Sequence, residues 1–202
     1  MNKDHPKLFP TILRLEHHLL HNAGNLLTDA CILYKAKSYP TAFALAVLAY
    51  EELGKLNLID QVGFSSWLSD PDVRKIRLER LFSRKSAYNH IIKQRWALHL
   101  TGEFSQLYQD GHLDHLKQSA LYVGFRNGRI MPPDRLTATT AYNQIKRVVK
   151  LIEKTDDLAF IQPFQGSTAA TRRKAMSYIK SARQCLAEIT APKRRRRKVA
   201  KP

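Results

Sequence analysis

Residues 39–56, YPTAFALAVLAYEELGKL, constrain the fold more than any other part of the chain. The apolar side chains fall on nearly every side of a helix, which predicts a helix buried in the middle of a bundle. Pro40 suits the first turn, because its φ is fixed and it has no amide hydrogen. Three charged residues follow at once: Glu51, Glu52 and Lys55. Ionised side chains are rarely buried without partners. These three residues therefore either fix the packing of neighbouring helices or form part of a functional site.

The spacing of these three residues suggests how they are paired. Glu51 and Lys55 are four residues apart, so they can pair on one face of the helix. Glu52 lies about 100° further around the helix and needs a partner from another element. His90 and Lys93 are candidates for that partner, in which case the group is a buried polar network that joins two helices.

The remaining pattern predicts an all-α fold. Helices are expected at residues 10–37, from residue 40 to between 58 and 63, at 71–100, 133–154 and 168–189, with a less regular short helix in 103–116 that Gly111 breaks. Residues 116–133 read as an ordered irregular loop. The sequence therefore predicts one bundle of long antiparallel helices over residues 1–190, followed by a disordered basic tail at 191–202. The expected inward side chains of the last two helices are Ala141, Ile145, Val148, Val149 and Ile152, then Ala175, Ile179, Ala182 and Leu186.

The chain is strongly basic, with a formal net charge of +17. The last ten residues carry seven lysines and arginines, and without them the remainder still carries +10. A basic body of this kind attracts polyanions, so RNA or another polyanion is the expected partner. The tail would add non-specific affinity for phosphate.

Other composition signals concern compartment and cofactors. Cys31 and Cys185 have no metal-type spacing and both fall in helical patterns, which predicts buried, reduced thiols. The start of the chain has no apolar signal-peptide core, and the apolar run after Pro40 is too short to cross a bilayer, so a cytoplasmic protein without membrane contact is expected. His17 and His21 have a spacing that can bind one ion, but no third ligand is evident, so neither a metal nor a cofactor is predicted.

Four segments together resemble the AbiV group of bacterial abortive-infection proteins, which belong to the HEPN class of small helical bundles. They are residues 22–42, the EELGK run at 51–55, YNHIIKQ at 88–94 and LYVGFRNGRIMPP at 121–133. They occur in the expected order over roughly residues 20–133. The resemblance implies a HEPN-like bundle, a role in phage defence, and RNA cleavage or binding. By the same analogy a homodimer is expected.

HEPN nucleases carry an arginine and a histidine separated by four to six residues, and Arg84 with His90 fits that pattern. Arg14 and His21 fit it as well, but only Arg84 and His90 lie in the segment after EELGK, where His90 and Lys93 match the family's His-x-x-Lys element. His90 would act as the general base on a ribose 2′-OH, and Arg84 or Lys93 would stabilise the charge on the transition state. A hydrogen-bonded, half-buried histidine that supports helix packing remains the alternative for His90.

Further cations extend this predicted site. Lys85 follows Arg84, where HEPN nucleases often have a small polar or acidic residue, and it can contact nucleic acid. Arg126 and Arg129 follow the aromatic residues Tyr122 and Phe125, a mixture that can stack bases and pair with phosphate, or simply fix a loop to the bundle.

Three functional hypotheses follow. The first is an AbiV-like protein of phage defence that acts on RNA as a metal-independent endoribonuclease or as an RNA binder, with Glu51, Glu52 and Lys55 holding the site in place. The second is a non-enzymatic helical module that binds a phage protein or a host translation protein. The third is a basic nucleic-acid-binding protein with no role in defence.

Overall fold

The computed structural model describes residues 5–66, 93–94, 97, 112–122, 124–126, 129–131, 136–161 and 169–190. Within these ranges the chain is almost entirely helical, which confirms the all-α prediction. The expected helix at 71–100 lies mostly outside the described residues, although residues 93, 94 and 97 are helical. The basic tail at 191–202 also lies outside them.

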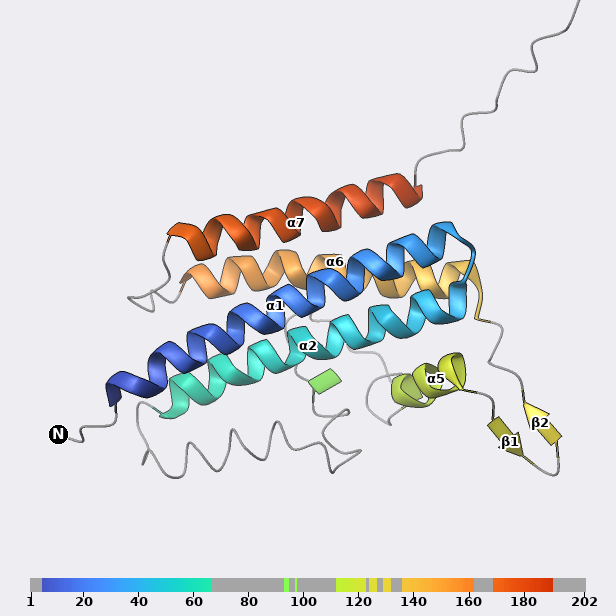
Figure 1. Cartoon of the computed structure of the whole chain (residues 1–202), viewed down its shortest axis with the longest axis horizontal. Coiled ribbons are helices and arrows are strands. Elements are labelled where there is room, and N and C mark those ends of the chain that lie inside the picture. Colours follow the sequence, from blue (N-terminus) through green and yellow to red (C-terminus); the bar gives the residue numbers. More distant parts are fainter. Residues whose placement is uncertain are drawn as a thin grey trace, which may run out of the picture.

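Two long helices form the antiparallel pair at the start of the fold (Figure 1). Helix α1 covers His5–Lys35 and helix α2 covers Tyr39–Ser66, so α2 runs past Gly63, where the sequence predicted its end. Lys37 has φ 64° in the turn between them. There the Lys37 amide donates to the Tyr34 carbonyl and the Ser38 amide to the Leu33 carbonyl, a pattern that satisfies the last carbonyls of α1.

Helix α2 is the buried helix that its composition predicted. It contacts α1, α5 and α6, and most of its apolar side chains between residues 42 and 56 are buried. Small side chains dominate the run, so neighbouring backbones can approach closely. The buried residues are Ala42, Phe43, Ala44, Ala46, Val47, Ala49, Tyr50, Leu53 and Leu56.

Helix α6 spans Ala138–Ile161 and helix α7 spans Ala169–Thr190. The five residues of α6 that the sequence placed inward, from Ala141 to Ile152, are all buried. Helix α7 lies at the edge of the bundle against α1 and α6, with Cys185, Leu186 and Ile189 partly buried on the core (Figure 1). The prediction for Leu186 is therefore confirmed, whereas the side chains of Ala175, Ile179 and Ala182 lie outside the description.

The region before α6 differs from the predicted loop. Helix α5 covers His112–Leu121 and begins directly after Gly111. Strands β1, Gly124–Arg126, and β2, Arg129–Met131, form an antiparallel pair. The prediction of an irregular loop was wrong here, because Asn127-Gly128 between two short apolar runs is the dipeptide that favours a hairpin. In Figure 1, α5 and the hairpin lie at the opposite edge of the bundle from α7.

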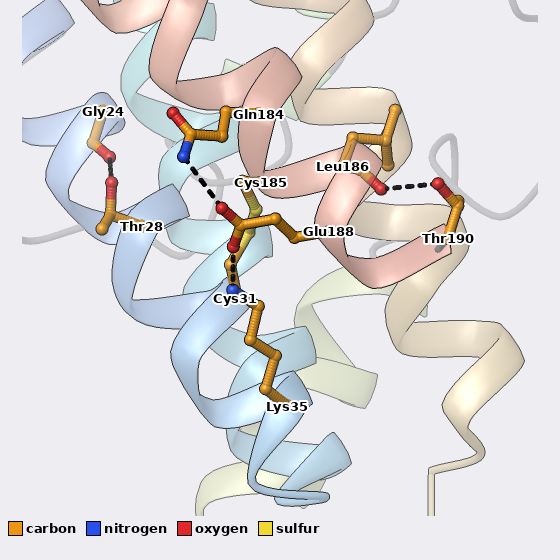
Figure 2. The surroundings of a disulfide bond; sticks show 9 residues. All are labelled: Gly24, Thr28, Cys31, Lys35, Gln184, Cys185, Leu186, Glu188 and Thr190. Carbon is orange, nitrogen blue, oxygen red and sulfur yellow. Dashed lines mark hydrogen bonds and ion pairs between the residues drawn. A yellow bond between two sulfur atoms is a disulfide. The ribbon is translucent and has the colours of Figure 1, made fainter. Parts of the chain in front are cut away.

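The prediction of two reduced thiols was also wrong. Cys31 of α1 and Cys185 of α7 are joined by a disulfide, with their Cα atoms 6.2 Å apart (Figure 2). The two cysteines are 154 residues apart in the sequence, and they meet because α1 and α7 pack side by side. No local pattern could reveal that contact.

Candidate functional site

The carboxylate of Glu51 lies inside the fold, although α2 carries it at the end of an apolar run. The residue is only 3% exposed. Its Oε1 accepts hydrogen bonds from Gln94 Nε2 at 2.9 Å and from Lys117 Nζ at 2.8 Å. Glu51 therefore joins α2 to α5 and to the helical segment that contains Gln94. We call this group, with Glu52, Lys55, Lys93 and Asp114, the charge cluster.

Lys117 of α5 is the buried counter-ion of Glu51. It is 2% exposed, and its Nζ also lies 2.7 Å from Asp114 Oδ1. Burial alone would lower the pKa of Lys117, but the Glu51 charge and the polar contacts with Asp114 and Glu51 together raise it. Lys117 is thus held as a cation between two carboxylates.

The pairing on α2 differs from the one that spacing suggested. Lys55 pairs with Glu52, three residues before it, and not with Glu51. Both side chains are only partly buried. The expected Glu51–Lys55 pair is wrong because Glu51 is turned inward toward Lys117, which is more deeply buried than Lys55.

Lys93 is buried beside this group, with 8% of its surface exposed. Burial, and then the charge of Lys55, lowers the pKa of Lys93, and the carboxylates of Glu51 and Glu52 offset only part of this effect. The two buried lysines of the charge cluster therefore have pKa values shifted in opposite directions. Lys117 is stabilised as a cation, whereas Lys93 loses its proton more readily than an ordinary lysine.

The backbone at Lys93 lies directly against Gly54 of α2. A Cβ atom at position 54 would overlap the Lys93 carbonyl oxygen and would lie 2.8 Å from the carbonyl carbon. Only glycine permits this approach, because the obstructing atoms belong to the main chain. Together with the Glu51–Gln94 hydrogen bond, this contact fixes residues 93 and 94 on α2.

A model of the AbiV family, of the HEPN class, matches residues 11–153. The chain belongs to the AbiV family. No curated protein and no solved structure matches the chain at a significant level. The match includes the charge cluster and the hairpin, and it ends before α7.

The structure of this AbiV protein describes only part of the site that the sequence predicted. Glu51, Glu52, Lys55 and Lys93 lie together in the charge cluster. Arg84, Lys85 and His90 lie outside the described residues. Arg126 and Arg129 are register partners in the hairpin, so their Cα atoms face each other across the two strands.

Sequence reasoning missed three members of the site: Gln94, Asp114 and Lys117. A signal was present for Lys117, since it falls on the apolar face of α5 between Leu113 and Ala120 and all three are buried. A lysine at such a position needs a buried partner. The acidic residue three positions before it, Asp114, supplies one such partner and Glu51 supplies the other.

Neither a membrane-spanning helix nor a metal-binding cluster is found in the described part of the AbiV chain. None of its helices is long and apolar enough to cross a membrane. In the same part, no group of three or more histidine, cysteine, aspartate or glutamate side chains is placed to hold a metal ion.

Proposed function

We propose that this AbiV protein acts in phage defence by cleaving or binding RNA, with His90 as the general base and Arg84 and Lys93 as phosphate contacts. The observation that carries the proposal is the attachment of residues 93 and 94 to α2. Gly54 contacts the Lys93 backbone, and Glu51 accepts a hydrogen bond from Gln94 at 2.9 Å. A site that must hold a phosphate needs its cation on such a fixed backbone.

In the proposed reaction, His90 takes the proton of a ribose 2′-OH. The 2′ oxygen attacks the adjacent phosphorus to form a 2′,3′-cyclic phosphate, and the bond from phosphorus to the 5′ oxygen of the next nucleotide breaks. That 5′ oxygen takes up a proton from water. The charge on the phosphoryl oxygens rises in the transition state, and Arg84 and Lys93 stabilise it. Glu51 and Lys117 act as positioning residues, because each neutralises the other inside the fold.

The basic character of the chain supports an RNA partner. The net charge of +17 favours association with any polyanion. Arg126 and Arg129 are register partners in the hairpin, so the chain carries two arginines at neighbouring backbone positions there. We propose that these arginines and Lys85 contact the phosphate backbone of the bound RNA, and that the protein works in the cytoplasm as a homodimer.

A second function is favoured by the composition of the charge cluster. Among the described residues it holds three carboxylates and three lysines, so its formal charge is balanced. A balanced buried cluster serves stability without any reaction. In this proposal the protein is a non-enzymatic module that binds a phage protein or a host translation protein.

The two proposals are separated by RNA integrity after expression of the wild type, His90→Ala and His112→Ala at equal abundance. His112 is an exposed histidine at the start of α5, so its substitution is the matched control. The nuclease is supported if the wild type and His112→Ala produce discrete RNA fragments while His90→Ala leaves the RNA intact. The thermal unfolding midpoint of His90→Ala must be unchanged for this comparison. Intact RNA with all three, combined with retained phage protection by His90→Ala, excludes the nuclease and supports the interaction module.

A further inference from the structure

Helix α7 follows the part of the chain that matches the AbiV family, and it is attached to α1 along one line of contacts. The match ends at residue 153, and α7 begins at Ala169. Gly24 faces Tyr178, Cys31 is bonded to Cys185, and Lys35 pairs with Glu188. Residue numbers increase together in all three pairs, so α1 and α7 run parallel. Seven residues separate the first two contacts on each helix, which is two helical turns.

At the first contact, the Tyr178 ring of α7 lies in a notch in the surface of α1 that Gly24 leaves open. A Cβ atom at Gly24 would lie 2.8 Å from Cδ1 of Tyr178, so the ring occupies the space that glycine leaves open. The His21 ring meets the Tyr178 ring edge-on, with centroids 5.7 Å apart. This contact holds α7 against α1 at one point.

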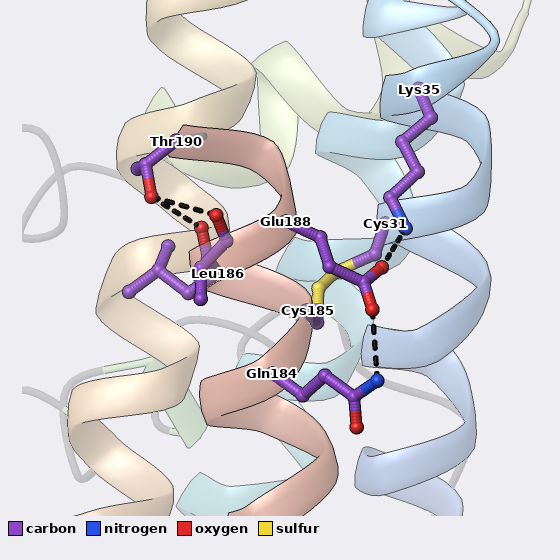
Figure 3. Close-up of polar contacts among 8 residues, drawn as sticks. Cys31, Lys35, Gln184, Cys185, Leu186, Glu188 and Thr190 are labelled. Atoms are coloured by element: carbon purple, nitrogen blue, oxygen red, sulfur yellow. Dashed lines mark hydrogen bonds and ion pairs between the residues drawn. A yellow bond between two sulfur atoms is a disulfide. The ribbon is translucent and has the colours of Figure 1, made fainter. Parts of the chain in front are cut away.

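The described polar contacts between α7 and the rest of the bundle are at the surface and contribute little to its attachment. Glu188 accepts hydrogen bonds from Lys35 and from Gln184, the latter at 2.9 Å (Figure 3). Arg183 pairs with Glu153 of α6 at 2.8 Å, and both side chains are substantially exposed. Exposed pairs of this kind are weak and are screened by salt. The disulfide is therefore the strongest described link between α7 and the bundle.

The two cysteine residues differ in exposure. Cys31 is only 3% exposed and belongs to the core, whereas Cys185 is partly exposed on α7. Figure 2 shows the bond lying between the two helices, next to Glu188 and Gln184. Because Cys185 is the more exposed of the two residues and thiol–disulfide exchange depends on access, we expect a thiolate from solvent to attack the Cys185 sulfur.

We propose that the Cys31–Cys185 bond is a redox-responsive latch that holds α7 on α1 and is opened by a dithiol reductant. One thiolate of the reductant attacks the Cys185 sulfur, the bond between the two cysteines breaks, and Cys31 leaves as a thiolate. The second thiolate of the reductant then attacks the reductant's first sulfur, which is bonded to Cys185 in the mixed disulfide, and Cys185 leaves as a thiolate. The reductant ends as a disulfide, and both cysteine thiolates take up protons from water.

Among the described contacts, reduction leaves α7 with the Tyr178 ring, the partly buried Leu186 and Ile189, and the weak surface pairs. Local opening of such an edge helix becomes more frequent when its covalent link is removed. Opening uncovers the Gly24 notch and the Cys31 thiol on α1. Helix α2 and the charge cluster stay packed, since they contact α1, α5 and α6 instead. Opening of α7 therefore does not depend on whether the protein cleaves RNA.

Amide hydrogen exchange on the full chain tests the latch, with and without dithiothreitol. For the oxidised wild type, we expect dithiothreitol to reduce protection of the α7 amides at least tenfold and to leave α2 unchanged. The double variant Cys31→Ser/Cys185→Ser is the matched control, and it should show the low α7 protection in both conditions. The proposal is overturned if the protein still has two free thiols after oxidation. It is also overturned if reduction leaves the protection of the α7 amides unchanged, or if the α2 amides lose as much protection as those of α7.

A second measurement tests which sulfur is attacked. A monothiol such as glutathione forms a mixed disulfide that only a second glutathione molecule can resolve. At limiting glutathione, with the freed protein thiol alkylated at once, the adduct can therefore be mapped by peptide mass. We expect the adduct on Cys185. An adduct mainly on Cys31 would contradict the proposed direction of opening.

Discussion

Gly54 of α2 and the carbonyl group of Lys93 are packed so closely that no side chain fits between them, since a Cβ atom at Gly54 would lie 2.8 Å from the Lys93 carbonyl carbon. The obstructing atoms belong to the backbone and cannot turn aside. The contact brings two parts of the family resemblance, EELGK and YNHIIKQ, into one structure. The contact gives a physical reason for the glycine in EELGK, because a larger residue at position 54 would overlap the backbone of Lys93.

Gly54→Ala is therefore expected to destabilise the fold by about 2 kcal/mol or more, because the helix bearing Lys93 must move away from α2. Gly24→Ala is the matched control, since its neighbour is the ring of Tyr178 and a side chain can shift. The better helix propensity of alanine, about 1 kcal/mol, should then offset much of the loss at position 24. Denaturant unfolding measures both, and equal losses would contradict the backbone contact.

Lys117→Met is expected to lower the free energy of unfolding by about 3 kcal/mol, because it leaves the buried Glu51 carboxylate without its cation. Lys146→Met on the exposed face of α6 is the control and should change stability by less than about 0.5 kcal/mol. Combining Lys117→Met with Glu51→Gln should cost less than the sum of the two single changes. Additive losses would show that the two residues do not interact.

Lys93→Met is expected to separate function from stability. Burial disfavours the charged form of Lys93 and lowers its pKa, so at neutral pH its charge opposes folding. That penalty decreases as the pH rises toward the ordinary lysine value. Replacement by methionine should change stability by less than about 1.5 kcal/mol and should abolish RNA cleavage. Retained cleavage would remove Lys93 from the proposed site.

Lys37→Gly is expected to stabilise the turn between α1 and α2 by about 1 kcal/mol, since Lys37 has φ 64° and glycine adopts that conformation without a steric penalty. Ala36→Gly, one residue earlier, is the control and should bring no such gain. Thermal unfolding measures the difference. A loss of stability in Lys37→Gly would mean that its side chain contributes more than the strained φ costs.

The Lys35–Glu188 pair should weaken in acid, with only a small effect on the attachment of α7 because the pair is exposed. Hydrogen bonds from Lys35 and Gln184, together with the Lys35 charge, hold the pKa of Glu188 below its ordinary value of 4.5. Its stabilising effect is therefore present above pH 4.5 and is lost as the pH falls through the lowered pKa. An NMR titration should show this pKa returning toward 4.5 in Lys35→Gln. An unchanged value would contradict the pair.

Much of the fold could be predicted from sequence because helices follow a local rule. The period of apolar residues placed α1, α2, α6 and α7 to within a few residues at most ends, and it placed the five inward residues of α6 correctly. The hairpin was missed because its strands have three residues each, too few to show an alternating pattern.

The sequence by itself determined which residues are charged within a buried helix, and hence that Glu51 needs a partner. Only the tertiary structure decided which partners it has, because Gln94 and Lys117 are 43 and 66 residues away in the sequence. Lys55, the partner that the spacing suggested, pairs with Glu52 instead. The same holds for Cys31 and Cys185. The physical reason is that periodicity fixes the face on which a side chain lies, whereas the packing of helices decides what lies opposite.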